Sequence, residues 1–353
     1  MIEIRAAQVF AHIEKNDSTK VSFLIKSLIE NSRTYFPNGW DEKPYGLDDM
    51  DHGSYGSITS AICALALIKA LKLELEKNQQ EQIIEKLNKV FDTFYFFENN
   101  GHIVKNLINK SKVFNTDLLV ALAIAKYLEI LPKASVRKKL FKEICLRCIN
   151  KTISSQLPNG AFRYHELSIG VPFLYQAMCT SLLFTLSNYI SHPYIYKSAY
   201  KGSLYLLKNY DANNFSFNWS KANCTDKSGS IWIYGWIPTI LDSVNKKKDF
   251  DAIINHIEKV QLFDGNFKPF DIENNLDTKT DKFYSALMVV ALSISESVRI
   301  DKTNLKKIDY IFFYDIFYFF SGIFKLVHCI VKQFKRKLLN KFLPLGALEN
   351  ENW

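Results

Sequence analysis

Apolar residues recur at helical spacing through most of the chain, and the helices that they predict are of two alternating kinds. In the first kind, for example 79–97, apolar residues occupy one face and charged residues the other. In the second kind, for example 57–77 and 115–131, nearly every residue is apolar. A helix with one apolar face suits an outer layer, whereas one that is apolar all round must be surrounded by protein. The alternation predicts an all-α fold with an inner and an outer layer of helices.

Prolines and glycines interrupt helices, and here they fall mostly between twelve periodic segments. Tight connections alternate with long ones, and in a ring of antiparallel helices all the long connections share one rim. Long loops in a compact domain are usually functional, so we expect that rim to be the working face. The expected helices are 2–14, 18–36, 57–77, 79–97, 115–131, 134–156, 172–191, 193–209, 230–246, 248–262, 280–297 and 303–342. The long connections are 37–56, 98–114, 157–171, 210–229 and 263–279.

The five long connections open on similar turns. Each begins with Asn-Gly, Asn-Asn or Asp-Gly, at intervals of 51 to 62 residues, and such pairs supply the positive-φ positions of a tight turn. A longer motif, QxxxGx(F/W), is complete at 156–162 (QLPNGAF) and 261–267 (QLFDGNF). This motif resembles the repeat of the α/α-toroid superfamilies. Those superfamilies include terpenoid cyclases and protein prenyltransferases, and also toroidal glycan lyases and hydrolases.

The resemblance covers about residues 18–300 and implies an (α/α)6-type toroid. Five pairs of outer and inner helices would form most of the ring, and the last and first helices would close it. The resemblance does not select a function, because toroids host unrelated chemistries. We assign 1–302 to the toroid domain and 303–353 to an aromatic and basic C-terminal segment.

The C-terminal segment is dense in Phe and Tyr over 308–331 and rich in Lys and Arg after that. Asp309, Asp315, Lys325 and His328 interrupt the apolar run, so it is a poor membrane span. Two alternatives stay open. The helix closes the ring as an outer helix, or the 308–342 helix lies on a membrane surface with its basic residues beside anionic headgroups.

Charge and cysteine usage indicate the compartment and exclude one class of partner. The N-terminus lacks the basic and apolar regions of a signal peptide, and five of six cysteines lie in apolar helical runs. We therefore expect a cytoplasmic protein, membrane-peripheral if the C-terminal helix contacts lipid. The net charge of +9 favours anionic partners, but the long loops are acidic and aromatic, so we expect no nucleic-acid partner.

The first long connection combines groups that transfer protons with groups that contact sugars. We expect Asp49 and His52 to be catalytic, because carboxylate and imidazole groups exchange protons near neutral pH. We expect Trp40 and Tyr55 to bind substrate, because aromatic faces stack on pyranose rings. A structural alternative stays open, in which the aspartates of this loop cap turns and the start of the next helix.

The third long connection holds Tyr164, His165 and Glu166, which we expect to be catalytic, beside Arg163. In toroidal polysaccharide lyases, Tyr and His remove the proton α to a uronate carboxylate, and Arg or Asn neutralises that carboxylate. The resemblance thus implies an anion-binding role for Arg163 and for Asn218 on the same rim. The alternative is a loop salt bridge with a packed tyrosine.

The last two long connections add aromatic and acidic residues. Trp219, Trp232 and Trp236 lie within eighteen residues of one another and are expected to stack on sugar. Asp271 and Tyr284 are expected to bind substrate as well. Core packing of the tryptophans, or the lining of an isoprenoid cavity, explains the same cluster.

We expect no cofactor and no metal, because the chain lacks GxxxxGK(S/T), GxSxG and HExxH motifs and a Cys/His set at zinc-ligand spacing. The leading hypothesis is a toroid enzyme that acts on a polysaccharide or lipid-linked saccharide by lyase, epimerase or hydrolase chemistry. An isoprenoid cyclase- or prenyltransferase-like enzyme that uses the central cavity is one alternative. A non-catalytic binding toroid is the other.

Overall fold

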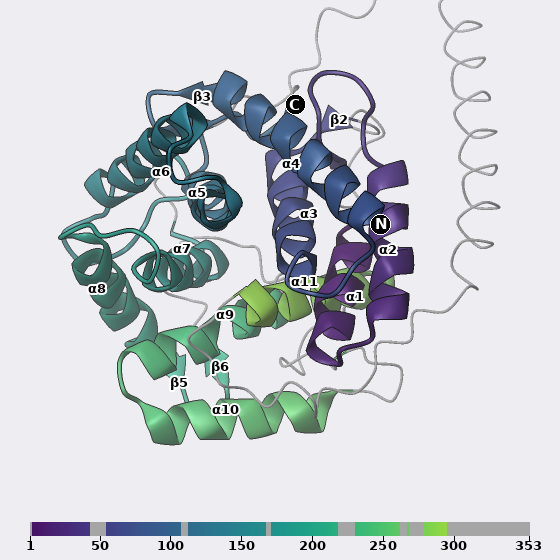
Figure 1. Cartoon of the computed structure of the whole chain (residues 1–353). Coiled ribbons are helices and arrows are strands. Elements are labelled where there is room, and N and C mark those ends of the chain that lie inside the picture. Colours follow the sequence, from purple (N-terminus) through teal and green to yellow (C-terminus); the bar gives the residue numbers. More distant parts are fainter. Residues whose placement is uncertain are drawn as a thin grey trace, which may run out of the picture. The chain divides into compact units, whose positions relative to one another are not determined.

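The computed structural model describes residues 2–42, 54–106, 112–166, 171–217, 230–261, 267 and 278–294. These residues form helices joined by short antiparallel strand pairs, as Figure 1 shows. The helices are α1 (Ile2–Glu14), α2 (Ser18–Glu30), α3 (Ser57–Ala70), α4 (Lys77–Phe97), α5 (Phe114–Ile130), α6 (Val136–Ser154), α7 (Phe173–Leu186), α8 (Ile195–Leu207), α9 (Ser230–Ser243), α10 (Lys247–Val260) and α11 (Thr278–Ile294). The strands are β1 (Asp41–Glu42), β2 (Ser54–Tyr55), β3 (Glu98–Asn99), β4 (His102–Ile103), β5 (Tyr210–Asp211) and β6 (Ser216–Phe217).

The odd-numbered helices form a closed inner ring. Each of α1, α3, α5, α7 and α9 contacts the next odd-numbered helix, and α11 contacts both α9 and α1 (Figure 1). Near the closure, Lys69 of α3 forms an ion pair with Glu14 of α1 and donates to the carbonyl oxygen of Ser293 in α11 at 3.4 Å. The even-numbered helices α2, α4, α6, α8 and α10 pack outside this ring.

The two layers differ in burial as the sequence predicts. In α5, an inner helix, every side chain from Phe114 to Leu128 is buried. In α10, an outer helix, the buried side chains are Ile253 and Ile257, one turn apart. Burial of apolar side chains stabilises a fold by about 25 cal/mol per Å² of apolar surface removed from water, so the inner ring carries most of the core.

Several expected helices end earlier in the structure than in the sequence-based prediction. The helix expected over 18–36 ends at Glu30, and the one expected over 57–77 ends at Ala70. At the first of these ends, the backbone and side-chain amides of Asn31 both donate to the carbonyl oxygen of Ser27. These bonds satisfy a carbonyl of the last turn and allow the chain to leave the helix. The helix expected over 303–342 lies outside the described residues.

The described parts of the first three long connections lie together on one rim. Hairpins β1–β2, β3–β4 and β5–β6 each lie in a different long connection. Neighbouring connections are also joined, by an antiparallel bridge between Gly56 and Asn106 and another between Val113 and His165.

A repeated hydrogen bond fastens these connections to the inner helices. The backbone N–H of Trp40, Ile103 and Phe162 donates to Ser60, Asp117 and Gln176 respectively, at 3.0, 2.7 and 2.6 Å. Each acceptor is the fourth residue of its inner helix, namely α3, α5 or α7. The backbone N–H of Phe267 donates to Ser285 of α11 in the same way, at 3.1 Å.

The QxxxGx(F/W) motif has a direct structural explanation at 156–162. The Gln156 side-chain amide donates to the carbonyl oxygens of Gly160 and of Ser198 in α8, both at 2.9 Å. Gly160 has φ +91°, and a Cβ there would lie 2.3 Å from the carbonyl oxygen of Lys201. Phe162 is buried in the core. The motif therefore holds a turn against the neighbouring outer helix.

Candidate functional site

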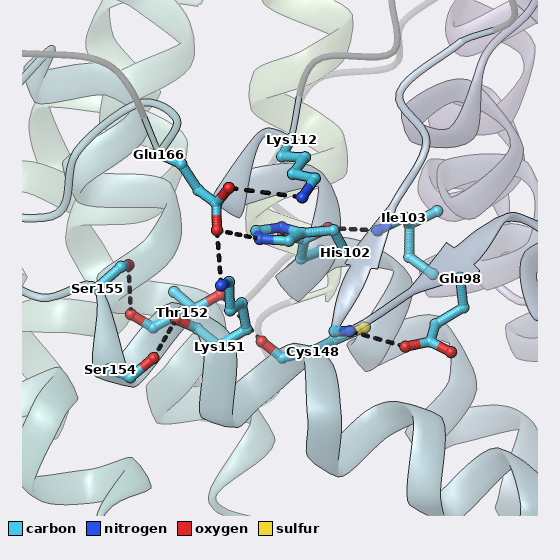
Figure 2. Close-up of polar contacts among 12 residues, drawn as sticks. Glu98, His102, Ile103, Lys112, Cys148, Lys151, Thr152, Ser154, Ser155 and Glu166 are labelled. Atoms are coloured by element: carbon cyan, nitrogen blue, oxygen red, sulfur yellow. Dashed lines mark hydrogen bonds and ion pairs between the residues drawn. The ribbon is translucent and has the colours of Figure 1, made fainter.

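A group of polar contacts on the described part of the long-loop rim is centred on His102, the first residue of β4. The turn before it, Asn100-Gly101, has positive φ angles of 51° and 84°, which places the imidazole beneath the third long connection. The ring is 2% exposed. Its Nε2 lies 3.0 Å from Glu166 Oε1 (Figure 2). Its Nδ1 lies 2.7 Å from Asp117 Oδ2. An imidazole therefore lies in line between two carboxylates.

Asp117 fixes one end of this row. It belongs to the first turn of α5, where its Oδ1 accepts the backbone N–H of Ile103 while Oδ2 faces His102. The equivalent fastening residues in α3 and α7 are Ser60 and Gln176, so only α5 of these three helices provides a charged group. Complete burial raises the pKa of Asp117 to about 6, although the hydrogen bond from His102 opposes this effect.

Glu166 forms the outer end of the row. Its Oε1 accepts from Lys151 Nζ of α6 at 2.6 Å, and its Oε2 lies 3.6 Å from Lys112 Nζ (Figure 2). Its side chain is 32% exposed. The hydrogen bonds from Lys151 and His102 lower the pKa of Glu166 to about 2, so it is a carboxylate at neutral pH.

Proton counting assigns the charge of His102. Two hydrogen bonds to ionised carboxylates need a proton on each ring nitrogen, which makes the ring an imidazolium. Burial lowers the pKa of His102, but the hydrogen bonds and charges of Asp117 and Glu166 outweigh burial and raise it above its usual value. In this row of three side chains, the imidazolium of His102 therefore lies between the buried carboxylate of Asp117 and the partly exposed carboxylate of Glu166.

A second ion pair holds the hairpin that carries His102. Glu98 of β3 accepts the backbone N–H of Gly101 at 2.7 Å, and Arg147 Nη2 of α6 lies 2.7 Å from its other oxygen. A Cβ at Gly101 would lie 2.6 Å from the carbonyl oxygen of Arg147. The β3–β4 hairpin is thus packed closely against α6. This packing and the contacts with Asp117 and Glu166 together fix the position of the His102 imidazole.

The raised pKa of His102 predicts a pH dependence of stability. The folded chain holds a proton that the unfolded chain releases, so the stabilisation is complete below about pH 6.5 and is lost as the pH rises through the folded pKa. Urea unfolding at a series of pH values is expected to show a steeper loss of unfolding free energy above about pH 6.5 in the wild type than in His102→Gln. His192→Gln, in the connection between α7 and α8, is the matched control and should keep the wild-type slope. Equal slopes for all three proteins would contradict the assignment.

Of the residues predicted from sequence, those of the third long connection lie in or beside this site. Glu166 is a member of the row. Tyr164 is half-buried, with its ring centroid 4.4 Å from that of Tyr175, and His165 is half-buried beside it. Arg163 is exposed on the same segment. The roles predicted for Tyr164, His165 and Arg163 stay predictions.

Four aromatic residues that were expected to contact sugar are part of the core. Trp40, Tyr55 and Trp236 are 0 to 1% exposed, and Trp232 is 7% exposed. The indole N–H of Trp40 donates to the carbonyl oxygen of Leu28 at 2.8 Å, and Lys86 Nζ lies 5.6 Å from the centroid of its ring. Packing accounts for these side chains, and we do not retain them as sugar-stacking residues.

The remaining predicted residues cannot be assigned to the site. Asp49, His52, Asn218, Trp219 and Asp271 lie outside the described residues, and Tyr284 is placed only as part of the α11 backbone. Sequence reasoning missed His102 and Asp117. The available signal was a histidine directly after an Asn-Gly turn, followed by an acidic residue in the first turn of an otherwise apolar helix.

Metal-binding clusters and membrane-spanning helices are both absent from the described residues. Within them, no group of three or more His, Cys, Asp and Glu side chains is arranged to hold a metal ion. None of the helices in the same part of the chain is long and apolar enough to cross a membrane.

Comparison with solved structures identifies the architecture. A family 76 α-mannanase from Bacteroides thetaiotaomicron superposes with a TM-score of 0.57 at 12% identity, over 84% of this chain and 86% of that one. The fold is that of the α/α toroids. A D-mannose isomerase gives 0.57 at 13% identity over 84% and 87% of the two chains. An α-amylase from Clostridium perfringens gives 0.54 at 14% identity over 83% and 85%. The sequence matches no protein-family model and no curated protein.

Proposed function

We propose that this toroid is an enzyme that acts on a saccharide by proton transfer, in the isomerase, epimerase or lyase class. The observation that carries the proposal is the hydrogen-bonded row of Glu166, His102 and Asp117 on the long-loop rim. A histidine held by a buried carboxylate is a common arrangement for general acid–base catalysis, because the carboxylate orients the ring and stabilises its charged form.

The geometry of the row favours proton transfer over hydrolysis by two carboxylates. A glycosidase needs two carboxyl groups that face each other across the sugar, about 5–10 Å apart. Here Asp117 is fully buried behind the imidazole, so the row presents Glu166 as its one accessible carboxylate. Nε2 of His102 is the atom that would exchange a proton, once Glu166 has moved away from it.

The reaction would begin at a carbon next to a carbonyl or uronate carboxylate. When Glu166 moves away, the Nε2 proton that its charge held passes to water and leaves His102 neutral. Neutral Nε2 then takes the proton from that carbon, and the electron pair of the C–H bond forms an enolate. Asp117 stabilises the resulting imidazolium through Nδ1–H. Return of the proton to the carbon on the other face, or to the neighbouring carbon, gives an epimer or an isomer. Loss of a β-oxygen substituent from the enolate gives a lyase product.

Positive charge around the row suits the developing oxyanion. Lys112 is exposed, Lys151 is half-buried, and both lie at the carboxylate of Glu166, while Arg163 is exposed on the same connection. When Glu166 moves, these lysines lose their carboxylate partner and can attract an anionic oxygen of the substrate. Tyr164 and His165 remain candidates for contact with the same substrate.

The structural neighbours support a saccharide in preference to an isoprenoid. They include an α-mannanase, an α-amylase and a D-mannose isomerase, of which the last is named for the isomerisation of a sugar. A lipid-linked saccharide stays within the proposed substrate class.

Deuterium incorporation distinguishes the proposed reaction class from hydrolysis. The purified chain is incubated in heavy water with a panel of aldoses, ketoses, N-acetylhexosamines and uronate-containing oligosaccharides, and the products are followed by proton NMR. Turnover with deuterium at the carbon next to the carbonyl or carboxylate supports proton transfer. Cleavage that leaves an unsaturated uronate by β-elimination also supports proton transfer, although it forms no C–D bond. Cleavage of a glycosidic bond with neither a new C–D bond nor an unsaturated product would overturn the proposal in favour of hydrolysis. Saturable binding without any turnover across the panel would favour a binding toroid.

A further inference from the structure

The outer helix α8 carries an apolar stripe on its solvent-facing side. Tyr196, Tyr200 and Leu204 are spaced by four residues and lie on one face of the helix, and Tyr194 precedes them. These four side chains are 44 to 58% exposed. Outer helices of a soluble ring normally present charged residues at such positions, so this stripe requires an explanation.

Positive charge runs alongside the stripe. Lys197 and Lys201 follow Tyr196 and Tyr200 directly, Lys208 follows the end of α8, and all three are exposed. No aspartate or glutamate occurs from residue 167 to residue 210. In the part of the chain that the structure describes, Lys197 and Lys201 have no ion-pair partner.

The neighbouring outer helix α6 is also basic. It contacts α8 and lies beside it in the ring (Figure 1). Just past the end of α6, Gln156 donates to the carbonyl oxygen of Ser198 and accepts from the Ser198 hydroxyl. Its exposed side includes Lys139 and Lys142, and Glu143 is its one acidic residue. The surface formed by the α8 stripe with Lys197 and Lys201, here called the α8 face, is therefore apolar and cationic together.

The combination of apolar and cationic side chains on the α8 face indicates which kind of partner it fits. A second copy of this face, or the lysine-rich 325–341 segment, would bring further positive charge to it. Nucleic acid and acidic glycan would satisfy the lysines, but they would leave the aliphatic side chain of Leu204 in water. An anionic lipid surface satisfies both, because aliphatic side chains enter the acyl boundary, tyrosines lie at the headgroup level and lysines reach the phosphates.

We propose that the α8 face binds the surface of an anionic membrane, with Tyr200 and Leu204 inserted at the headgroup boundary and Lys197 and Lys201 beside lipid phosphates. This proposal does not depend on the reaction at His102. It also differs from a contact made by the C-terminal 308–342 segment, because it rests on an outer helix of the ring.

Vesicle binding by the full chain tests the proposal. The partition coefficient is measured by co-sedimentation with phosphatidylcholine vesicles that contain phosphatidylserine, and with phosphatidylcholine alone. Lys197→Gln/Lys201→Gln is expected to lower binding to the anionic vesicles about 25-fold, from about fivefold for each lysine. The matched control is Lys247→Gln/Lys248→Gln on α10, which removes the same charge from another exposed outer helix and should retain wild-type binding.

A second pair of variants tests the apolar part. Tyr200→Ser/Leu204→Ser is expected to weaken binding to the anionic vesicles, whereas Phe23→Ser, at an exposed site on α2, should not. The C-terminal lysines are present in every protein, so their contribution is common to all comparisons. Equal partition of the α8 variants and their controls would overturn the proposal. So would unchanged vesicle binding with a loss of binding to duplex DNA or heparin, which would make the α8 face a polyanion-binding surface.

Discussion

His102→Asn is expected to lower kcat/KM for proton transfer by about 10²- to 10⁴-fold, the usual contribution of a general acid–base residue. Asparagine retains a hydrogen-bonding side chain between Asp117 and Glu166, but it has no nitrogen that exchanges a proton near neutral pH. The measurement is the initial rate of deuterium incorporation into the substrate found in the heavy-water panel. Because the row also joins three elements, thermal unfolding of the variant is recorded in parallel.

Two comparisons separate a catalytic role of His102 from a structural one. Glu166→Gln is expected to retain more activity than His102→Asn and to shift the pH profile, since Glu166 sets the charge of the imidazole but must leave it before reaction. His192→Asn, remote from the row, should behave as the wild type. If His102→Asn folds and keeps activity within about threefold of the wild type, well short of a general acid–base contribution, then His102 is a structural cross-link and the proposed mechanism is wrong.

Gly160→Ala is expected to reduce the free energy of unfolding by about 3–5 kcal/mol. The backbone of Gly160 has φ +91°, which costs a residue with a Cβ about 1–2 kcal/mol. The new Cβ would also lie 2.3 Å from the carbonyl oxygen of Lys201, so α8 must shift away from the turn. Displacement of α8 also disturbs the bonds between Gln156 and Ser198.

Chemical denaturation at constant pH measures this loss. Pro158→Ala is the matched control, because it lies in the same turn and is exposed, and it should stay within about 1 kcal/mol of the wild type. A Gly160→Ala variant as stable as this control would show that the turn and α8 are free to separate. The role of the QxxxGx(F/W) motif as a fastening between the turn and α8 would then be wrong.

The layered ring was predictable because it depends on patterns that extend over whole helices. The contrast between 115–131, apolar all round, and 248–262, with one apolar face, is confirmed by the burial of α5 and α10. The rim with the long loops followed from the order of the connections alone. Helix ends were less predictable, because they depend on single side chains such as that of Asn31, which satisfies the last turn of α2.

The site was harder to predict because its members are close in space and separated in sequence. Glu166 and His102 are 64 residues apart, and no local motif links them. Asp117 also accepts the backbone N–H of Ile103, as the equivalent residues of α3 and α7 do for their connections. Its position in the repeat therefore indicates a structural role and gives no sign of a chemical one. For the tryptophans, the residue type was noticed but the position was misjudged. Their residue type suggested a sugar platform, but the burial of Trp40 and Trp236 depends on the tertiary packing of the ring.

The contact between α1 and α11 means that the N-terminal helix finds one of its two ring neighbours almost at the end of the domain. During synthesis, a nascent chain that extends only through α9 can form an open arc, in which α1 and α9 each have one apolar side without a neighbour. Contacts between segments so distant in sequence form slowly, and uncovered apolar sides promote association between chains. We therefore expect translation past residue 294, the end of α11, to be the event that allows the domain to fold, and prematurely terminated chains to depend on chaperones for solubility.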